Sequence, residues 1–96
     1  MKPGYVYILT NKPDGVLYIG VTDNLAKRVE QHRARAVPGF TKDYNCDRLI
    51  WFERFDDLQD ARLTEARMKK WNRAWKVARI VERNPNWQDL VDTLNR

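Results

Sequence analysis

The sequence is short of several features that define large classes of protein. Its single cysteine, Cys46, excludes an internal disulfide and a thiolate metal site, and it agrees with a reducing compartment. No apolar run approaches the roughly 20 residues that a membrane-spanning helix needs. The N-terminal residues 1–4 also lack the apolar core of a signal peptide. We therefore expect a cytoplasmic protein with no membrane association.

The residues that are present indicate one small globular unit. The chain has 96 residues, 43% of them hydrophobic and 32% charged, which is enough apolar surface to offset the entropy of ordering the chain. There is no internal repeat, linker or low-complexity stretch. We expect a single folded domain over residues 1–96. The composition does not predict a disordered chain.

Positive charge is concentrated in one part of the chain. The net charge is +5, and residues 62–83 alone contain eight lysines and arginines against two glutamates, a net charge of +6. Such a segment suits contacts with the phosphates of a nucleic acid, or it is simply a solvated helix face; the sequence leaves both interpretations open. Trp71 and Trp75 interleave the segment, and we expect both in the core.

Three runs are rich in β-branched and aromatic residues and predict strands, at residues 5–9, 16–21 and 48–55. Residues 11–15 separate the first two and include Pro13 and Gly15, which favour a turn, so these strands are expected to form a β-hairpin. The third run is expected to join them in one sheet.

Helices are predicted between and after the strands. Asp23 is expected to cap a helix from about Asn24, with Leu25, Val29 and His32 on its inner face. A second helix is expected to begin at Asp57 and to run towards residue 71. Together these elements predict an α+β fold, a small three-stranded antiparallel sheet in β-β-α-β-α order flanked by helices.

Two C-terminal helices are expected to complete the fold. The first follows a break at Asn72 or Arg73, has Trp75, Ala78 and Val81 on its apolar face, and is closed by residues 84–85. The second is short, spans residues 87–94 and is capped by Asn86.

Two tyrosines lie on the two arms of the hairpin. If the loop has an even number of residues, Tyr7 and Tyr18 project from the same face, close enough to act on one ligand, with Gly20 leaving an open place beside them. An odd loop would separate them. The alternative is that both are ordinary half-buried tyrosines of a sheet.

Acidic and basic side chains occupy inward positions on the two main predicted helices. Glu65 falls on the apolar stripe of residues 58, 61, 65, 68 and 72, where a carboxylate needs a cation, either an arginine or a metal ion. Arg28 and His32 lie four residues apart at the margin of the buried face of the first helix. A histidine at such a place is most often a hydrogen-bonded packing residue.

Taken together, these residues resemble the signature of the GIY-YIG nuclease superfamily, in its short stand-alone bacterial form. Tyr5-Val6-Tyr7 matches the first tripeptide and Tyr18-Ile19-Gly20 the second. The family's arginine corresponds to Arg28, and residues 61–71 resemble the helix that bears its acidic metal ligand. Two positions depart from the pattern: Tyr5 replaces the first glycine, and Val21 stands where excision-repair relatives have a lysine.

The resemblance implies a metal-dependent endonuclease that acts on DNA, structure-preferring or weakly sequence-specific, in repair or recombination. Glu65 would hold one divalent cation, Mg²⁺ or Mn²⁺. Tyr7 would activate or position water with His32 or Tyr18, after neighbouring positive charge lowers its pKa or lets it relay a proton, and Arg28 would stabilise the transition state. The nucleic-acid backbone would follow four basic residues: Lys69, Lys70, Arg73 and Lys76.

Two other functions remain open on the sequence. One is a nucleic-acid-binding module that keeps the fold and the basic surface but does not turn over. The other is a domain that works only when docked on another protein, and a protein partner would also supply sequence specificity. The chain is too short to include a separate DNA-binding domain.

Overall fold

A three-stranded antiparallel sheet forms the centre of the protein in a computed structural model, which describes residues 2–36 and 39–95. The strands are β1 (Gly4–Thr10), β2 (Leu17–Thr22) and β3 (Arg48–Phe55), in the order β2-β1-β3. The predicted hairpin and third strand are confirmed. Because β1 lies in the middle, one side of β2 has no neighbouring strand in this sheet.

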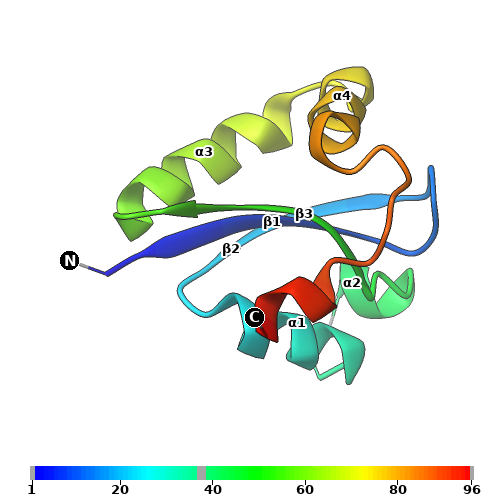
Figure 1. The fold of residues 1–96 in the computed structure, drawn as a ribbon, viewed down its shortest axis with the longest axis horizontal. Helices are drawn as coiled ribbons and strands as arrows, with labels where there is room; N and C mark the ends of the chain where they lie inside the picture. Colours follow the sequence, from blue (N-terminus) through cyan, green and yellow to red (C-terminus); the bar gives the residue numbers. More distant parts are fainter. Residues whose placement is uncertain (1, 37–38, 96) are drawn as a thin grey trace.

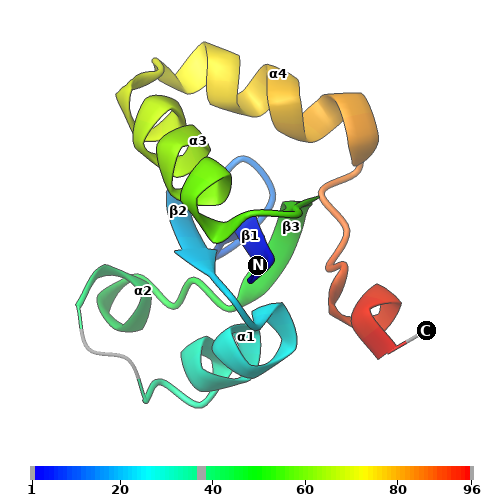
Figure 2. The same ribbon diagram turned by 90° about the vertical axis from the view of Figure 1, so that its left-hand side faces the viewer.

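Helices cover both faces of the sheet (Figures 1 and 2). On one face lie α3 (Leu58–Lys70) and α4 (Arg73–Arg83); on the other lie α1 (Leu25–Arg33), α2 (Phe40–Asp43) and the 3₁₀ helix η1 (Val91–Asn95). The α+β fold is therefore as predicted, whereas α2 was not. A helix of four residues has too few positions to show a helical period in the sequence.

Successive residues of β1 alternate between two apolar clusters, as the period of two requires, whereas β3 has an irregularity at Ile50 that puts both Ile50 and Trp51 in the same cluster. Val6 and Ile8 of β1 point to the α3 side, with Ile19, Ile50, Met68 and Ile80. Tyr7 and Leu9 point to the α1 side, with Leu25, Val29 and Leu49. The sheet is thus buried on both faces, and any site that needs access to solvent must lie at its margin.

Short polar side chains begin each of the longer helices. Asn24 caps α1, because its side-chain oxygen accepts from the backbone N–H of Lys27 at 3.2 Å. The prediction of Asp23 as the cap is wrong, since its carboxylate lies 2.8 Å from Lys2 Nζ. Asp57 caps α3 as predicted, and Asn72 caps α4.

The inner face of α4 differs from the prediction. Ile80 is buried and Val77 packs beside it on the core, whereas Trp75 is 62% exposed and Val81 38% exposed. The cap at Asn72 fixes where the helix starts, and residues 77 and 80, three apart, then face the sheet. Trp75, two residues before Val77, points away from the sheet, so the expectation of a core tryptophan holds only for the half-buried Trp71.

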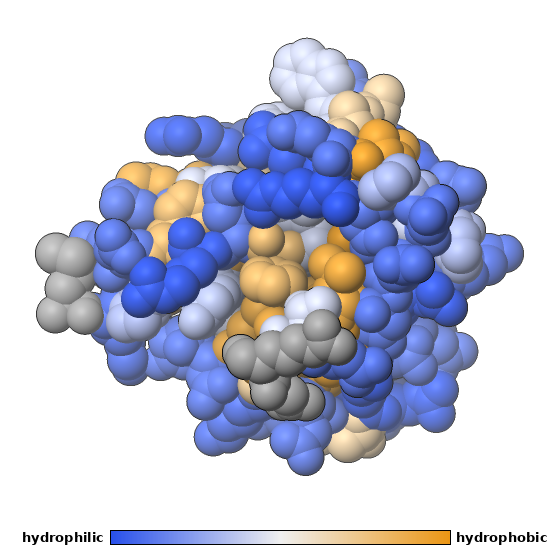
Figure 3. All heavy atoms as spheres, viewed as in Figure 1, coloured by the Kyte–Doolittle hydropathy of each residue, from blue (hydrophilic) through white to orange (hydrophobic). Residues whose placement is uncertain are grey.

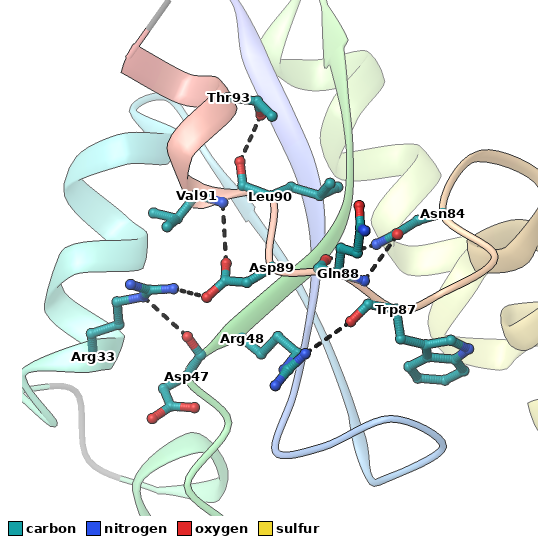
Figure 4. A network of polar contacts seen from close by, with 10 residues as sticks. All are labelled: Arg33, Asp47, Arg48, Asn84, Trp87, Gln88, Asp89, Leu90, Val91 and Thr93. Atoms are coloured by element: carbon teal, nitrogen blue, oxygen red, sulfur yellow. Dashed lines mark hydrogen bonds and ion pairs between the residues drawn. The ribbon is translucent and has the colours of Figure 1, made fainter.

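The segment after α4 is not the helix that was predicted over residues 87–94. Asn84 holds it in an irregular path: its side-chain amide donates to the backbone oxygen of Gln88, and its Oδ1 accepts from the Gln88 N–H (Figure 4). The same amide also donates to the backbone oxygen of Ile50. Trp87 has a positive φ of 54°, which a continuing helix does not allow. The regular structure is reduced to η1.

This segment returns along β3 to α1. The Leu90 N–H donates to the backbone oxygen of Leu49, and the Arg33 guanidinium of α1 pairs with Asp89 (Figure 4). The surface seen in Figure 3 is mainly hydrophilic, with hydrophobic side chains exposed in small patches. Among the residues that the structure describes, no helix combines the length and the apolar character needed to cross a membrane.

Candidate active site

Tyr7 and Tyr18 lie on the same face of the hairpin. In the pairing of β1 with β2, Tyr7 is opposite Gly20 and Leu9 is opposite Tyr18, so the two tyrosines are diagonal neighbours on the α1 side. Their ring centroids are 6.3 Å apart. The geometry expected for an even loop is therefore the geometry observed.

The absence of a side chain at Gly20 decides where the Tyr7 ring lies. A β-carbon built on Gly20 would be 2.4 Å from both Cζ and Oη of Tyr7, so the ring occupies the space that any other residue at position 20 would fill. Tyr7 starts on the central strand and extends over β2 towards its open side. Its side chain is buried, with 2% of the residue exposed.

His32 of α1 links the Tyr7 hydroxyl to α2. The Tyr7 oxygen lies 3.0 Å from His32 Nε2, and His32 Nδ1 lies 3.0 Å from Thr41 Oγ1. Burial and the nearby Arg28 charge both lower the pKa of His32, which favours the neutral ring near pH 7. A neutral ring that donates from Nδ1 to Thr41 accepts the Tyr7 O–H at Nε2.

The charges of Arg28 and Glu65 both act on the Tyr7 phenol. Burial is the largest cause that raises the pKa of Tyr7, and Tyr18 adds to it; Arg28 lowers this pKa and Glu65 raises it. Arg28 thus acts on the pKa of Tyr7 in the expected direction, but the net shift is upward, which leaves the second expected role, relay of a proton. Burial outweighs Arg28 because it removes the phenolate from water. A role for Tyr7 must then keep the phenol protonated or pass its proton on.

Arg28 places its charge near Tyr7 and His32, whose pKa values it lowers. It lies one helical turn before His32 on α1 and is half-buried. Within residues 2–36 and 39–95, no hydrogen bond or ion pair engages its side chain. A planar, charged fork in this state suits an oxyanion such as a phosphate.

Glu65 reaches the site from the other layer of the fold. It lies between the buried Ala61 and Met68 on the inner face of α3, and its side chain is 17% exposed. The cation beside it is Lys69, whose Nζ is 3.3 Å from the carboxylate. The expected arginine partner is therefore replaced by a lysine one turn along the same helix.

The donor set around Glu65 fits a hard divalent cation that keeps most of its water. Across the described part of the chain, no group of three or more His, Cys, Asp or Glu side chains gathers into a ready-made metal site. Mg²⁺ is commonly bound through one or two carboxylates, with waters and substrate phosphates completing its shell. A single, slightly exposed carboxylate agrees with that pattern. A soft metal would not suit this oxygen donor.

The four basic residues predicted to contact nucleic acid have different surroundings. Lys69 and Lys76 line a hollow of about 270 Å³ with Leu17, Tyr18, Ile19 and Phe40. Lys70 is exposed. Arg73 donates to the backbone oxygens of Asp14 at 2.9 Å and Gly15 at 2.7 Å, so it also fastens α4 to the hairpin loop.

This hollow places the site at the open side of β2. Leu17 and Ile19 face α3, whereas Tyr18 faces α1, and all three border it. The sequence assigned no role in the site to Phe40 or Thr41, which α2 brings to Tyr18 and His32. The signal was their place in residues 39–42, which resemble a loop of the short bacterial relatives and begin with Gly39, whose φ is 105°.

Replacing Gly20 with alanine is expected to displace Tyr7. The new methyl group would overlap the ring, which should cost about 1–3 kcal/mol of the free energy of unfolding and separate Tyr7 from His32. Urea unfolding measures the cost. In a Tyr7→Ala background the same substitution should cost much less, because the overlapping ring is gone. An equal cost in both backgrounds would contradict this account of Gly20.

Comparison with known proteins shows which proteins this chain is similar to. A UPF0213 protein of Clostridium perfringens is 35% identical over 91 residues, covering 95% of this chain and 97% of that protein. One from Syntrophus aciditrophicus is 35% identical over 86 residues, covering 88% of this chain and 97% of its own. The solution NMR structure of a UPF0213 protein from Bacillus halodurans has the same fold, with a TM-score of 0.57, 24% identity, and coverage of 91% of this chain and 92% of that one.

The family model of the GIY-YIG catalytic domain matches residues 3–78. This range includes both tyrosines, Arg28, His32 and Glu65, and it ends within α4. The chain belongs to the GIY-YIG family.

Proposed function

We propose that this protein is a divalent-metal-dependent endonuclease that hydrolyses phosphodiester bonds in DNA, with a preference for structure over sequence. Its family is that of a nuclease catalytic domain, which implies an endonuclease-type function and a nucleic acid as substrate. The observation that carries the proposal is the hydrogen bond between the buried Tyr7 phenol and His32, at a place where the charges of Arg28 and Glu65 both influence the pKa of the phenol. The proposal includes the cytoplasmic location that was expected from the sequence.

Arg28 is proposed to hold the scissile phosphate. The reaction adds negative charge to the phosphate oxygens in the transition state, and a guanidinium placed beforehand stabilises that charge without reorganising. Its position one turn from His32 puts the phosphate close to the group that handles the proton. Its planar fork can contact two phosphate oxygens at once, which a lysine cannot.

Tyr7 and His32 are proposed to relay the proton of the attacking water. The Tyr7 oxygen accepts a proton from the water while its own proton passes to His32 Nε2, 3.0 Å away. This route needs no free phenolate, which agrees with the raised pKa of Tyr7. It does need a neutral imidazole, which the lowered pKa of His32 supplies. Tyr18, whose ring centroid is 5.5 Å from that of His32, is proposed to help orient the water.

Glu65 would hold the cation, for which Mg²⁺ or Mn²⁺ fits the oxygen donor. When bound, the ion supplies Lewis-acid polarisation of a phosphate oxygen and positive charge near the leaving oxygen. Lys69 shares the Glu65 carboxylate at 3.3 Å, so it is expected to turn towards the nucleic acid when the carboxylate is engaged elsewhere. Its side chain is 52% exposed and has room to do so.

The basic residues of α3 and α4 are proposed to follow the phosphates beyond the reacting bond. Lys69 and Lys76 border the hollow at the site, and Lys70 is exposed on the same helix end. Arg73 contributes its charge while it holds the hairpin loop. Each such contact should add to the salt dependence of binding, because it displaces counterions.

Cleavage assays on a panel of labelled nucleic acids test the proposal. Single-stranded, flapped, branched and duplex DNA, with RNA counterparts, would be incubated with Mg²⁺, with Mn²⁺ or with a chelator. We expect cleavage of at least one DNA, dependent on the metal. Preference for a branched or flapped DNA would connect the activity to repair or recombination, and a requirement for a co-purifying protein would identify a partner for specificity.

The same panel also tests the second candidate function, a nucleic-acid-binding module without turnover. The Glu65–Lys69 pair favours this alternative, because the lysine already compensates the carboxylate that would hold the cation. Its signature would be salt-dependent binding of DNA without cleavage of any nucleic acid under either metal. That result would contradict the proposed activity.

A further inference from the structure

The hollow beside the site, here called the β2-edge hollow, combines an aromatic wall with two cations. Its lining comes from β2, α2, α3 and α4, and comprises Leu17, Tyr18, Ile19, Phe40, Lys69 and Lys76. None of the five residues to which the proposed function assigns chemistry, apart from Tyr18, lines it. The hollow is therefore an addition to the reacting centre.

Phe40 is the feature of this hollow that folding alone does not explain. It is 42% exposed, and Tyr44, with its ring centroid 4.6 Å from that of Phe40, is 50% exposed. The Phe40 and Tyr18 rings are 6.2 Å apart with their planes within 24° of parallel. Aromatic surface that stays in water beside a nucleic-acid site is suited to stacking on a base.

The backbone holds Phe40 in this exposed position. Gly39 before it has φ 105° and ψ −146°, a conformation that is essentially confined to glycine. Thr41 after it is buried and bonded to His32 Nδ1. The backbone of Phe40 is thus placed between a glycine turn and a residue that is hydrogen-bonded to the site, so its position relative to His32 is set by the fold.

The two lysines identify the class of occupant. A peptide side chain would be satisfied by the apolar wall, whereas a nucleotide presents a flat base with phosphates on both sides. Lys69 and Lys76 stand at the wall of the hollow, and the segment of residues 62–83 to which they belong has a net charge of +6. Aromatic rings flanked by cations are how proteins bind single strands without reading sequence.

We propose that the β2-edge hollow is a subsite for one unpaired nucleobase next to the reacting phosphate, stacked on Phe40 with Lys69 and Lys76 on the neighbouring phosphates. This inference rests on the proposed function for the position of the phosphate. A base inside a duplex cannot reach the Phe40 ring, so the substrate must be single-stranded or locally unpaired at that nucleotide.

Binding measured in a chelator, where no cleavage occurs, tests the subsite. Phe40→Ala should weaken binding of a short single-stranded oligodeoxynucleotide by about 5- to 100-fold, the range for loss of one stacked base, and leave duplex binding unchanged. Phe40→Trp should retain affinity. Leu63→Ala is the matched control, because Leu63 is 58% exposed on α3 and does not line the hollow.

Salt and abasic substitutions separate stacking from charge. Phe40→Ala should leave the slope of log affinity against log salt unchanged, whereas a Lys69→Gln/Lys76→Gln double variant should flatten it. A set of oligonucleotides, each with one abasic position at a different place along the strand, should show weaker binding to the wild type at one of these places. For Phe40→Ala, the oligonucleotide that is abasic at that place should bind as well as the intact one. If Phe40→Ala unfolds, the abasic scan on the wild type still decides.

The outcomes distinguish this inference from the proposed function. Wild-type affinity in Phe40→Ala, no position-dependent loss in the abasic scan, or no binding of single strands by the wild type would each overturn the subsite. If Phe40→Ala and the abasic scan behave as expected but no metal supports cleavage, the subsite stands and the endonuclease proposal fails. If cleavage occurs and Phe40→Ala has no effect on single strands, only the subsite fails.

Discussion

Replacing Arg28 by alanine should slow cleavage by about 10³- to 10⁵-fold, the range for an arginine that stabilises phosphoryl transfer. The guanidinium acts on both Tyr7 and His32 and is engaged by no other described residue, so its loss removes charge from the reacting centre. Arg28→Lys should recover only part of the rate, because an ammonium lacks the planar fork. Single-turnover rates at saturating DNA measure the effect.

Lys27→Ala provides the matched control for Arg28. Lys27 is the preceding residue of α1, exposed to solvent, and its removal changes the net charge by the same amount. Its cleavage rate should stay within a few-fold of the wild type. DNA affinity in Arg28→Ala should also change little, because most of the binding charge lies on α3 and α4. A rate in Arg28→Ala within tenfold of the wild type would remove Arg28 from the proposed mechanism.

Glu65→Gln should lower metal-supported cleavage by at least about 100-fold. Changing a residue that only supports a metal ligand already costs up to about 100-fold in affinity or activity, and losing the ligand itself should cost no less. Glutamine keeps the shape of the side chain but not the charge that binds a hard cation. DNA affinity should be unchanged or slightly higher, because Lys69 loses its carboxylate partner. Rates measured across a Mg²⁺ titration, with binding measured separately, distinguish loss of the ion from loss of the substrate.

Two controls isolate the role of Glu65. An i,i+4 pair of this kind contributes only about 0.3–0.5 kcal/mol, so thermal unfolding should show little change and the loss of rate cannot come from unfolding. Glu30→Gln, which removes an exposed carboxylate from α1, should cleave like the wild type. Full activity in Glu65→Gln would exclude the carboxylate as the metal ligand.

The local pattern of the sequence predicted most of the elements. Runs rich in β-branched and aromatic residues at 5–9, 16–21 and 48–55 predicted the three strands, and Leu25, Val29 and His32 at helical spacing predicted the buried face of α1. These features depend on neighbours two to four residues apart, so they can be read along the chain. The family signature rests on the same segments, which is why it was visible before the structure.

Other features depend on contacts between distant segments, so the local sequence patterns missed them or misplaced them. The Trp75 ring was expected in the core, but the phase of α4 is set by its cap and by packing of Val77 and Ile80 on the sheet. The residues after Asn84 were expected to be helical, but the Asn84 side chain ties them to β3 and holds them in another path. In each case a tertiary contact overrode local propensity.

Most residues of the candidate site were predicted from the sequence, but their arrangement was not. The sequence placed Tyr7 and Tyr18 on one face only if the hairpin loop had an even number of residues, and it placed Glu65 on an inner stripe. Only the tertiary structure passes the Tyr7 ring over Gly20, leaves the outer side of β2 open, and brings α2 to it with Phe40 and Thr41. The reason is physical: periodicity fixes which way a side chain points from its own element, whereas the packing of elements far apart in the chain fixes what it meets there.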